Sequence, residues 1–237
     1  MGKKNKDVTV LILAGGLGTR LERALPNLPK SLAPIKRKPF LNRLLEQIDD
    51  AGFKKVILCT GYLGELIHEE FGKSYRGLSL IYSQEKQPFG TAGALRLAVP
   101  LIKSDLCLVM NGDSYINIDL NDFLQWHLSH HFKGSIVLKR MPKPMRYGTV
   151  EINPQEIVKN FSEKTDQKDP GWINAGVYLF HKSLLKSLPR DQFLSLERQV
   201  LPFWLKHKLG GYRSNGKFID IGTPESLKTA ETFFEKL

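Results

Sequence analysis

The sequence has little cysteine, and the cysteines that it has do not suggest a metal site. Cys59 and Cys107 are the only two in 237 residues. Each lies inside a short apolar, strand-like stretch, so we expect both to be buried free thiols. No spacing of cysteine and histidine fits a zinc site, and His130–His131 has no ligand partner nearby, which indicates a surface position.

Long hydrophobic runs are also missing. No apolar segment reaches the roughly 20 residues that a membrane-spanning helix needs. The longest one near the start, Val8–Ala14, is too short for a secretory signal and leads directly into glycines. We therefore expect a cytoplasmic protein with no membrane partner, and a frayed basic N-terminus over residues 1–7.

Acidic side chains are fewer than basic ones. The chain has 35 lysines and arginines against 24 aspartates and glutamates, which gives a formal net charge of +11. Such a balance favours an anionic partner. The basic residues are spread along the chain without forming a stripe, and no nucleic-acid-binding module is present. We therefore expect no nucleic-acid partner, and phosphorylated small molecules fit the charge as well.

The first half of the sequence alternates strand-like and helix-like segments. Continuous apolar runs rich in β-branched residues are typical of buried parallel strands, and segments with apolar residues at helical spacing separate them. The expected strands are Val8–Ala14, Lys55–Thr60, Leu78–Ser83 and Leu106–Met110, and the expected helices are Phe40–Asp50, Leu63–Phe71 and Gly93–Ile102. This order predicts βαβ units and an α/β fold with a mainly parallel sheet.

The second half of the sequence is less regular. The expected strands there are Ser135–Leu138, Gly148–Ile152, Ile157–Phe161, Ala175–Phe180 and Lys217–Ile221, and the expected helix is Pro224–Leu237. A turn at Asn153–Pro154 joins the second of these strands to the third. Because no repeat, linker or break in composition is visible, we predict a single domain over 1–237.

A glycine-rich loop follows the first expected strand. Gly15-Gly16-Leu17-Gly18 gathers backbone amides at the carboxyl end of a strand, where open α/β sheets bind anionic ligands. Arg20 and Lys30 follow, and both side chains can hold phosphate oxygens. The loop is not a dinucleotide fingerprint, because Leu21 replaces the third glycine. It is not a P-loop either, because Gly18-Thr19-Arg20 stands where Gly-Lys-Ser/Thr is required.

Longer sequence blocks surround this loop and extend over nearly the whole chain from Val8. They are Leu13–Leu21, Leu28–Ile35, Lys38–Leu41, Pro88–Ala94, Asn111–Asp113, Tyr147–Val150, Phe161–Lys164, Ile173–Tyr178 and Phe218–Pro224. The set resembles the sugar-1-phosphate nucleotidylyltransferase family. The resemblance implies a Rossmann-like, mainly parallel mixed sheet flanked by helices, with a nucleotide-binding half over about 8–125 and a sugar-binding half over about 126–237. It also implies that a nucleoside triphosphate and a sugar 1-phosphate are joined with release of pyrophosphate.

The resemblance also implies roles for particular residues. The triphosphate would be bound by Leu13, Ala14, Gly15, Gly16, Gly18, Thr19 and Arg20. Arg20, Lys30 and Asp113 would form the catalytic set, acting by positioning and charge neutralisation rather than as nucleophiles. Asp113 and Asp220 would meet at Mg²⁺, which takes few carboxylates alongside phosphate oxygens. The sugar phosphate would contact Lys30, Gly148, Glu163, Lys164 and Asn174.

The nucleotide base is expected near Glu85, Gly90 and Thr91. A carboxylate can accept two hydrogen bonds from guanine N1–H and N2–H₂, whereas an amide suits uracil or thymine. Thymidylyl and uridylyl members similar to this chain place glutamine before a Pro-x-Gly turn. Counting back from Gly90 puts Glu85 at that place, with Gln84 beside it, which favours GTP.

The prediction of which sugar 1-phosphate is bound depends on weaker signals in the sequence. Within the family, Arg146–Val150, Phe161–Lys164 and Phe218–Pro224 are most similar to D-glycero-α-D-manno-heptose 1-phosphate guanylyltransferases. Mannose-1-phosphate guanylyltransferase remains an alternative, although those enzymes usually have proline where Thr165 stands and often carry an added C-terminal repeat domain. N-acetylmuramate or hexose 1-phosphate uridylyltransferase also remains open. So does a catalytically inactive sugar-nucleotide sensor, although the intact charged residues argue against it.

Overall fold

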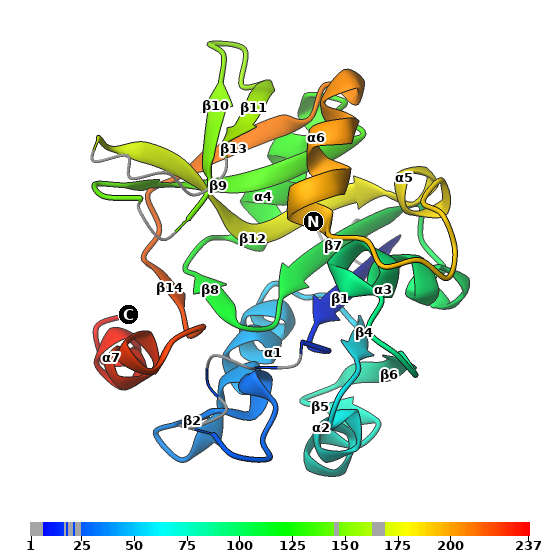
Figure 1. The fold of residues 1–237 in the computed structure, drawn as a ribbon, viewed down its shortest axis with the longest axis vertical. Helices are drawn as coiled ribbons and strands as arrows, with labels where there is room; N and C mark the ends of the chain where they lie inside the picture. The colour runs from blue at the N-terminus through cyan, green and yellow to red at the C-terminus, as the bar shows by residue number, and fades with distance from the viewer. Residues whose placement is uncertain (1–6, 17, 19–20, 22–24, 145–146, 163–168) are drawn as a thin grey trace.

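The computed structural model describes residues 7–16, 18, 21, 25–144, 147–162 and 169–237, and its centre is one ten-stranded mixed sheet. The strand order is β11-β10-β12-β7-β1-β4-β6-β5, with β9 paired to β12 and to β13 (Figure 1). The strands of this sheet are β1 Val8–Leu13, β4 Lys55–Thr60, β5 Ser74–Tyr75, β6 Leu78–Gln84, β7 Leu106–Asn111, β9 Gly134–Met141, β10 Thr149–Ile152, β11 Val158–Ser162, β12 Gly171–His181 and β13 Gly210–Ser214. Two small antiparallel pairs lie apart from it, β2 Pro34–Ile35 with β3 Lys38–Pro39, and β8 Ser114–Ile116 with β14 Phe218–Asp220.

Helices cover both faces of the sheet, which confirms the expected α/β fold. The α-helices are α1 Phe40–Asp50, α2 Gly64–Phe71, α3 Gly90–Ala98, α4 Leu120–Ser129, α5 Lys182–Lys186, α6 Leu201–Trp204 and α7 Pro224–Glu235. Short 3₁₀ and π turns lie at η2 Lys30–Leu32, η3 Val99–Leu101, η4 Leu196–Val200 and η5 Leu205–His207. The apolar residues of α1, α2 and α4 belong to one buried cluster, and those of α3, α5 and α6 to another.

The centre of the sheet is parallel, and its strands are apolar because both of their faces are covered. β1 lies between β4 and β7, with Val10 opposite Val56 on one side and Leu108 on the other. Within β1, Val10 packs in the first cluster and Leu11 in the second, as the two-residue period of a strand requires. A continuous apolar run in the sequence thus becomes a strand buried on both faces.

The structure differs from the sequence-based prediction at one helix near the glycine loop. α3 begins at Gly90, three residues before the expected Gly93, and ends at Ala98. Its first turn is stabilised by a distant segment, because the Leu194 carbonyl accepts hydrogen bonds from the amides of Ala92 and Gly93, at 2.9 and 3.4 Å. A cap supplied from so far along the chain leaves no local sequence signal.

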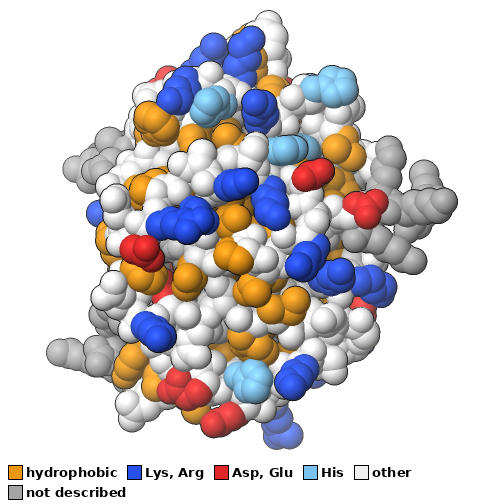
Figure 2. All heavy atoms as spheres, turned by 90° about the vertical axis from the view of Figure 1, so that its right-hand side faces the viewer, with side chains coloured by type: hydrophobic (Ala, Val, Ile, Leu, Met, Phe, Trp, Pro, Cys, Tyr) orange, Lys and Arg blue, Asp and Glu red, His pale blue; other side chains and the backbone are white. Residues whose placement is uncertain are grey.

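The expectation for the two cysteines is confirmed. Cys59 and Cys107 are buried free thiols, and burial raises the pKa of each to about 12. None of the helices among the described residues is long and apolar enough to cross a membrane. On the face shown in Figure 2, basic side chains are interspersed with apolar and acidic ones.

The buried histidine His127 on α4 makes the free energy of unfolding sensitive to acid. Its Nδ1 lies 2.7 Å from Ser135 Oγ, and burial, followed by the charge of His181, lowers its pKa from 6.5 to about 4. His127 is therefore protonated near pH 6.5 in the unfolded chain, but only near pH 4 in the folded chain. We expect this residue to remove on the order of 3 kcal/mol of stability as the pH falls through that window.

Urea unfolding of the wild type and of His127→Gln between pH 7.5 and about 4 measures this effect. The difference in free energy between the two proteins should change with pH, since glutamine does not titrate. The exposed His131, replaced by glutamine, is the matched control for changing a surface histidine. A pH-independent difference for His127→Gln would contradict the assignment.

Candidate active site

A cavity of about 600 Å³ opens at the carboxyl ends of β1 and β7, where open α/β sheets bind their ligands. It extends from these strand ends to the start of α3 and to η4. The residues that line it are Leu13, Ala14, Gly15, Gly16, Gly18, Lys30, Ser31, Glu85, Pro88, Gly90, Thr91, Ala94, Asn111, Gly112, Asp113, Phe193, Glu197 and Asp220. The cavity therefore joins residues from both halves of the chain.

The glycine loop forms one side of this cavity. Gly15 packs against Glu85 so closely that a side-chain carbon added at Gly15 would lie 3.0 Å from Glu85 Oε1 and from the Gly61 amide nitrogen. At Gly16 the same carbon would meet nothing within 4 Å. The first glycine thus lets the loop approach the carboxylate of Glu85, and the second leaves the loop open toward the cavity.

Lys30 and Asp113 form an ion pair on the opposite side of the loop. Lys30 begins the short turn η2, and its Nζ lies 3.5 Å from Asp113 Oδ2. The two side chains keep 21% and 36% of their surface exposed, so both charges are partly desolvated but still reachable from the cavity. The structure therefore brings together two members of the expected catalytic set. The third, Arg20, lies outside the described residues, as does Thr19.

Asp113 and Asp220 are neighbours although they lie 107 positions apart in the sequence, because Ser114, the residue after Asp113, pairs with Asp220 between β8 and β14. Next to that pair, the Ile221 amide donates to the Asp113 carbonyl at 2.9 Å. Both aspartates line the cavity, and Asp220 Oδ1 accepts the Gly222 amide at 2.6 Å, which orients the carboxylate. Two carboxylates lining the same cavity are a donor set that suits Mg²⁺. No cluster of three or more potential ligands occurs among the described residues.

Glu85 stands at the other end of the cavity, directly after β6. Its amide donates to the Thr60 carbonyl at 2.9 Å, and its Oε2 accepts the Phe89 amide at 3.1 Å. Partial burial raises the pKa of this carboxyl, and the hydrogen bond from Phe89 opposes that shift. One carboxylate oxygen thus holds the turn that leads into α3.

Apart from Lys30, the residues expected to bind the sugar phosphate are not gathered in the same way. Glu163 and Lys164 lie outside the described residues. Gly148 and Asn174 are described but do not line the cavity. Gly148 lies against the Ser162 carbonyl of β11, and Asn174 is engaged within the protein, with its Nδ2 donating to the Tyr178 hydroxyl at 2.8 Å.

Several lining residues were not predicted from the sequence. Asn111 and Ser31 adjoin predicted residues, so their place next to Asp113 and Lys30 was a usable signal. Phe193 and Glu197 belong to no recognised motif, and no helical or strand periodicity in the sequence marks them. Glu197 accepts a hydrogen bond from the Thr91 hydroxyl at 2.9 Å and a longer one from Tyr178 at 3.4 Å, so it ties the start of α3 to β12.

With this geometry established, comparison with known proteins identifies the family. The nucleotidyl transferase family matches residues 9–236. The chain belongs to this family.

Two curated relatives match over almost their whole length. The chain is 36% identical over 222 residues to D-glycero-alpha-D-manno-heptose 1-phosphate guanylyltransferase of Aneurinibacillus thermoaerophilus, covering 93% of this chain and 96% of the relative. It is 37% identical over 215 residues to the enzyme of the same name from Campylobacter jejuni, covering 91% and 95%. It is also 35% identical to mannose-1-phosphate guanylyltransferase of Mycobacterium tuberculosis, of which it covers 62%.

Solved structures agree with this assignment. The crystal structure of HddC from Yersinia pseudotuberculosis superposes with a TM-score of 0.86 at 32% identity, covering 95% of this chain and 99% of the other. The same protein complexed with GMP-PN superposes equally well. The family and the fold expected from the sequence are therefore confirmed.

Proposed function

We propose that this protein transfers GMP from GTP to D-glycero-α-D-manno-heptose 1-phosphate and releases pyrophosphate. The observation that carries the proposal is one cavity that holds both the Lys30–Asp113 pair and the carboxylate of Glu85. Heptose 1-phosphate guanylyltransferases match over more than nine tenths of both chains, which favours this sugar over others.

In the proposed reaction a phosphate oxygen of the sugar 1-phosphate attacks the α-phosphorus of GTP. The bond from that phosphorus to the bridging oxygen of the β-phosphate breaks, and pyrophosphate leaves with the bonding electrons. No proton needs to be removed from an ionised phosphate, so the protein's task is to position two polyanions and offset their charge. We assign the charge neutralisation to the glycine-loop amides, Arg20 and Lys30, with Lys164 on the phosphate of the sugar, and we assign the positioning of the sugar hydroxyl groups to Glu163.

Asp113 and Asp220 fit a divalent cation, and we propose Mg²⁺. Bound there, the ion would supply positive charge to the phosphate oxygens. The protein's own contribution is the β8–β14 pairing, which holds the two carboxylates side by side, and the Gly222 amide, which orients one of them.

A panel of pyrophosphate-release assays tests the proposal. The purified chain with Mg²⁺ is given GTP, UTP, dTTP, CTP or ATP together with the 1-phosphates of heptose, mannose, N-acetylmuramate or glucose. We expect GTP with heptose 1-phosphate to give the highest kcat/KM. A faster reaction with mannose 1-phosphate would instead support the function of a mannose-1-phosphate guanylyltransferase. If no pair of substrates releases pyrophosphate, the protein is not this enzyme and a catalytically inactive sugar-nucleotide sensor is the remaining function.

Replacing Glu85 with glutamine is expected to weaken the preference for GTP. Glutamine still accepts the Phe89 amide, so the turn before α3 is retained. It lacks the negative charge of the carboxylate, which accepts hydrogen bonds from the two guanine donors. The ratio of kcat/KM for GTP to kcat/KM for UTP should therefore fall by about 10- to 100-fold. Glu65→Gln on α2, outside the cavity, is the matched control. An unchanged ratio in Glu85→Gln would refute the base-reading role.

A further inference from the structure

The segment 192–197 passes the part of the cavity that lies near Glu85 and the start of α3, and it has an exposed phenylalanine there. Six large apolar residues are exposed in the described part of the chain, and Phe193, with 66% of its surface exposed, is the one among them that lines the cavity. Isolated exposed apolar residues are common, but one inside a ligand cavity gains from burial by a ligand.

This segment is held firmly against the turn that follows Glu85. The Leu194 amide donates to the Phe89 carbonyl at 2.8 Å, and the Leu194 carbonyl accepts the Ala92 amide at 2.9 Å. The Leu196 amide donates to the Thr91 hydroxyl at 2.7 Å. Figure 1 shows this gold segment, between α5 and α6, passing beside α3. Phe193 is therefore carried on a fixed backbone.

The contact between segment and turn leaves no room for side chains at two glycines. A carbon added at Gly90, where φ is +72°, would lie 2.6 Å from the Leu194 carbonyl oxygen. One added at Gly93 would lie 2.9 Å from the Gln192 carbonyl oxygen. Because Gln192 and Leu194, on both sides of Phe193, pack tightly against this turn, Phe193 lines the cavity close to the turn that follows Glu85.

We propose that Phe193 is the aromatic platform on which the purine base of the nucleotide packs. This inference rests on the proposed function, since it takes the nucleotide to be GTP with its base near Glu85. In-plane hydrogen bonds to Glu85 would select guanine, and the ring would bury the apolar face of the base. A purine offers more face to such a ring than a pyrimidine does, so Phe193 adds to the preference for GTP.

Nucleotide binding to the full chain, measured by titration calorimetry with Mg²⁺ and no sugar phosphate, tests the platform. Phe193→Ala should weaken GTP binding about tenfold, and UTP binding less. Inorganic tripolyphosphate, which has the phosphates but no base, should bind both proteins equally. Phe193→Trp keeps an aromatic face and should restore the affinity for GTP.

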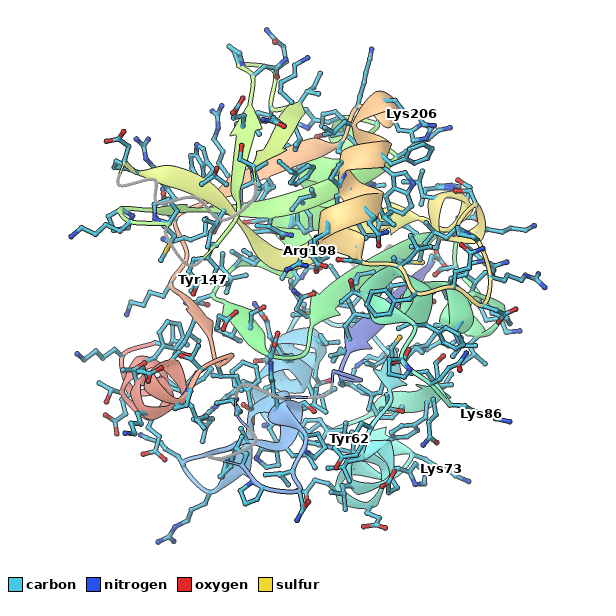
Figure 3. The ribbon with its side chains drawn as sticks, in the orientation of Figure 1. Tyr62, Lys73, Lys86, Tyr147, Arg198 and Lys206 are labelled. Carbon is cyan, nitrogen blue, oxygen red and sulfur yellow. The ribbon has the colours of Figure 1, made fainter. Side chains whose placement is uncertain are left out.

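Phe203 provides the matched control. It is a phenylalanine of similar exposure, 63%, and Lys206 Nζ lies 3.6 Å from the centre of its ring. Figure 3 places Lys206, in η5 after α6, at the edge of the molecule, whereas Arg198, in η4 before α6, lies toward the middle. Phe203→Ala should bind GTP as the wild type does.

Two results would overturn the platform and leave the proposed function intact. One is a GTP affinity in Phe193→Ala equal to that of Phe203→Ala. The other is an equal loss for GTP and tripolyphosphate, which would mean that Phe193 only supports the backbone of the cavity. A wild-type protein that does not bind GTP would overturn both proposals.

Discussion

Replacing Lys30 with alanine is expected to lower kcat by about 100- to 1000-fold while the protein stays folded. Lys30 is the positive charge that the described structure brings next to Asp113, and its Nζ is partly withdrawn from water, with 21% of the side chain exposed. In such surroundings a charge acts more strongly on the phosphates than it does in bulk water. Steady-state pyrophosphate release and circular dichroism together measure the two outcomes.

Lys36→Ala is the control for this experiment. Lys36 also forms an ion pair, 2.8 Å from Glu235, but it lies outside the cavity and its side chain is 42% exposed. Its replacement should leave kcat unchanged. Near-normal turnover in Lys30→Ala would refute the role of Lys30, and an equal loss in both variants would point to a general effect of removing a lysine.

Replacing Asp113 or Asp220 with asparagine should also reduce kcat, by about 100-fold or more, and should raise the concentration of Mg²⁺ needed for half-maximal activity. Asparagine keeps the size of the side chain but removes the charge that favours the cation. For Asp220 it still accepts the Gly222 amide, so the backbone turn is retained. Asp49→Asn is the control, because Asp49 pairs with Lys54 away from the cavity.

The double variant separates a shared ion from two independent effects. If both carboxylates hold the same cation, Asp113→Asn with Asp220→Asn should lose little more activity than either single change. Multiplicative losses would show that the residues act separately, for example through the contact of Asp113 with Lys30. Activity that survives a chelator in the wild type would contradict the metal assignment altogether.

The sequence predicts those parts of the fold that local patterns determine. β1, β4 and β7 are continuous apolar runs, and the structure places their ends within one residue of the expected bounds. The helix α4 and the strand β13 were missed. α4 begins at a cap, where Asp119 accepts the amides of Asn121 and Asp122, but its apolar residues are mixed with polar ones over only ten positions. β13 is five residues with a glycine pair and no alternation.

The site divides in a similar way between local and distant contacts. The glycine loop, Lys30 and Glu85 lie in or near short motifs, so residue order alone points to them. Phe193 and Glu197 reach the cavity through hydrogen bonds to a turn about 105 residues earlier in the chain, as the contact of Thr91 with Leu196 shows. No spacing rule encodes such a contact. Asn174 is a different case, because it lies in a predicted motif but bonds to Tyr178 and does not line the cavity.

The long strand β12 limits how this molecule can be divided. One of its edges pairs with β7 from the first half of the chain and, further along, with β10, and the other edge pairs with β9, so both halves of the chain meet on this strand. A cut between the halves, placed just after α4, would leave β7 with an unpaired edge in one fragment and β12 with an unpaired edge in the other. Exposed edges of that kind pair with whatever strand they meet. Two fragments produced together should therefore reassemble by pairing β7 with β12. The chain could then be divided between these two strands to make a split reporter.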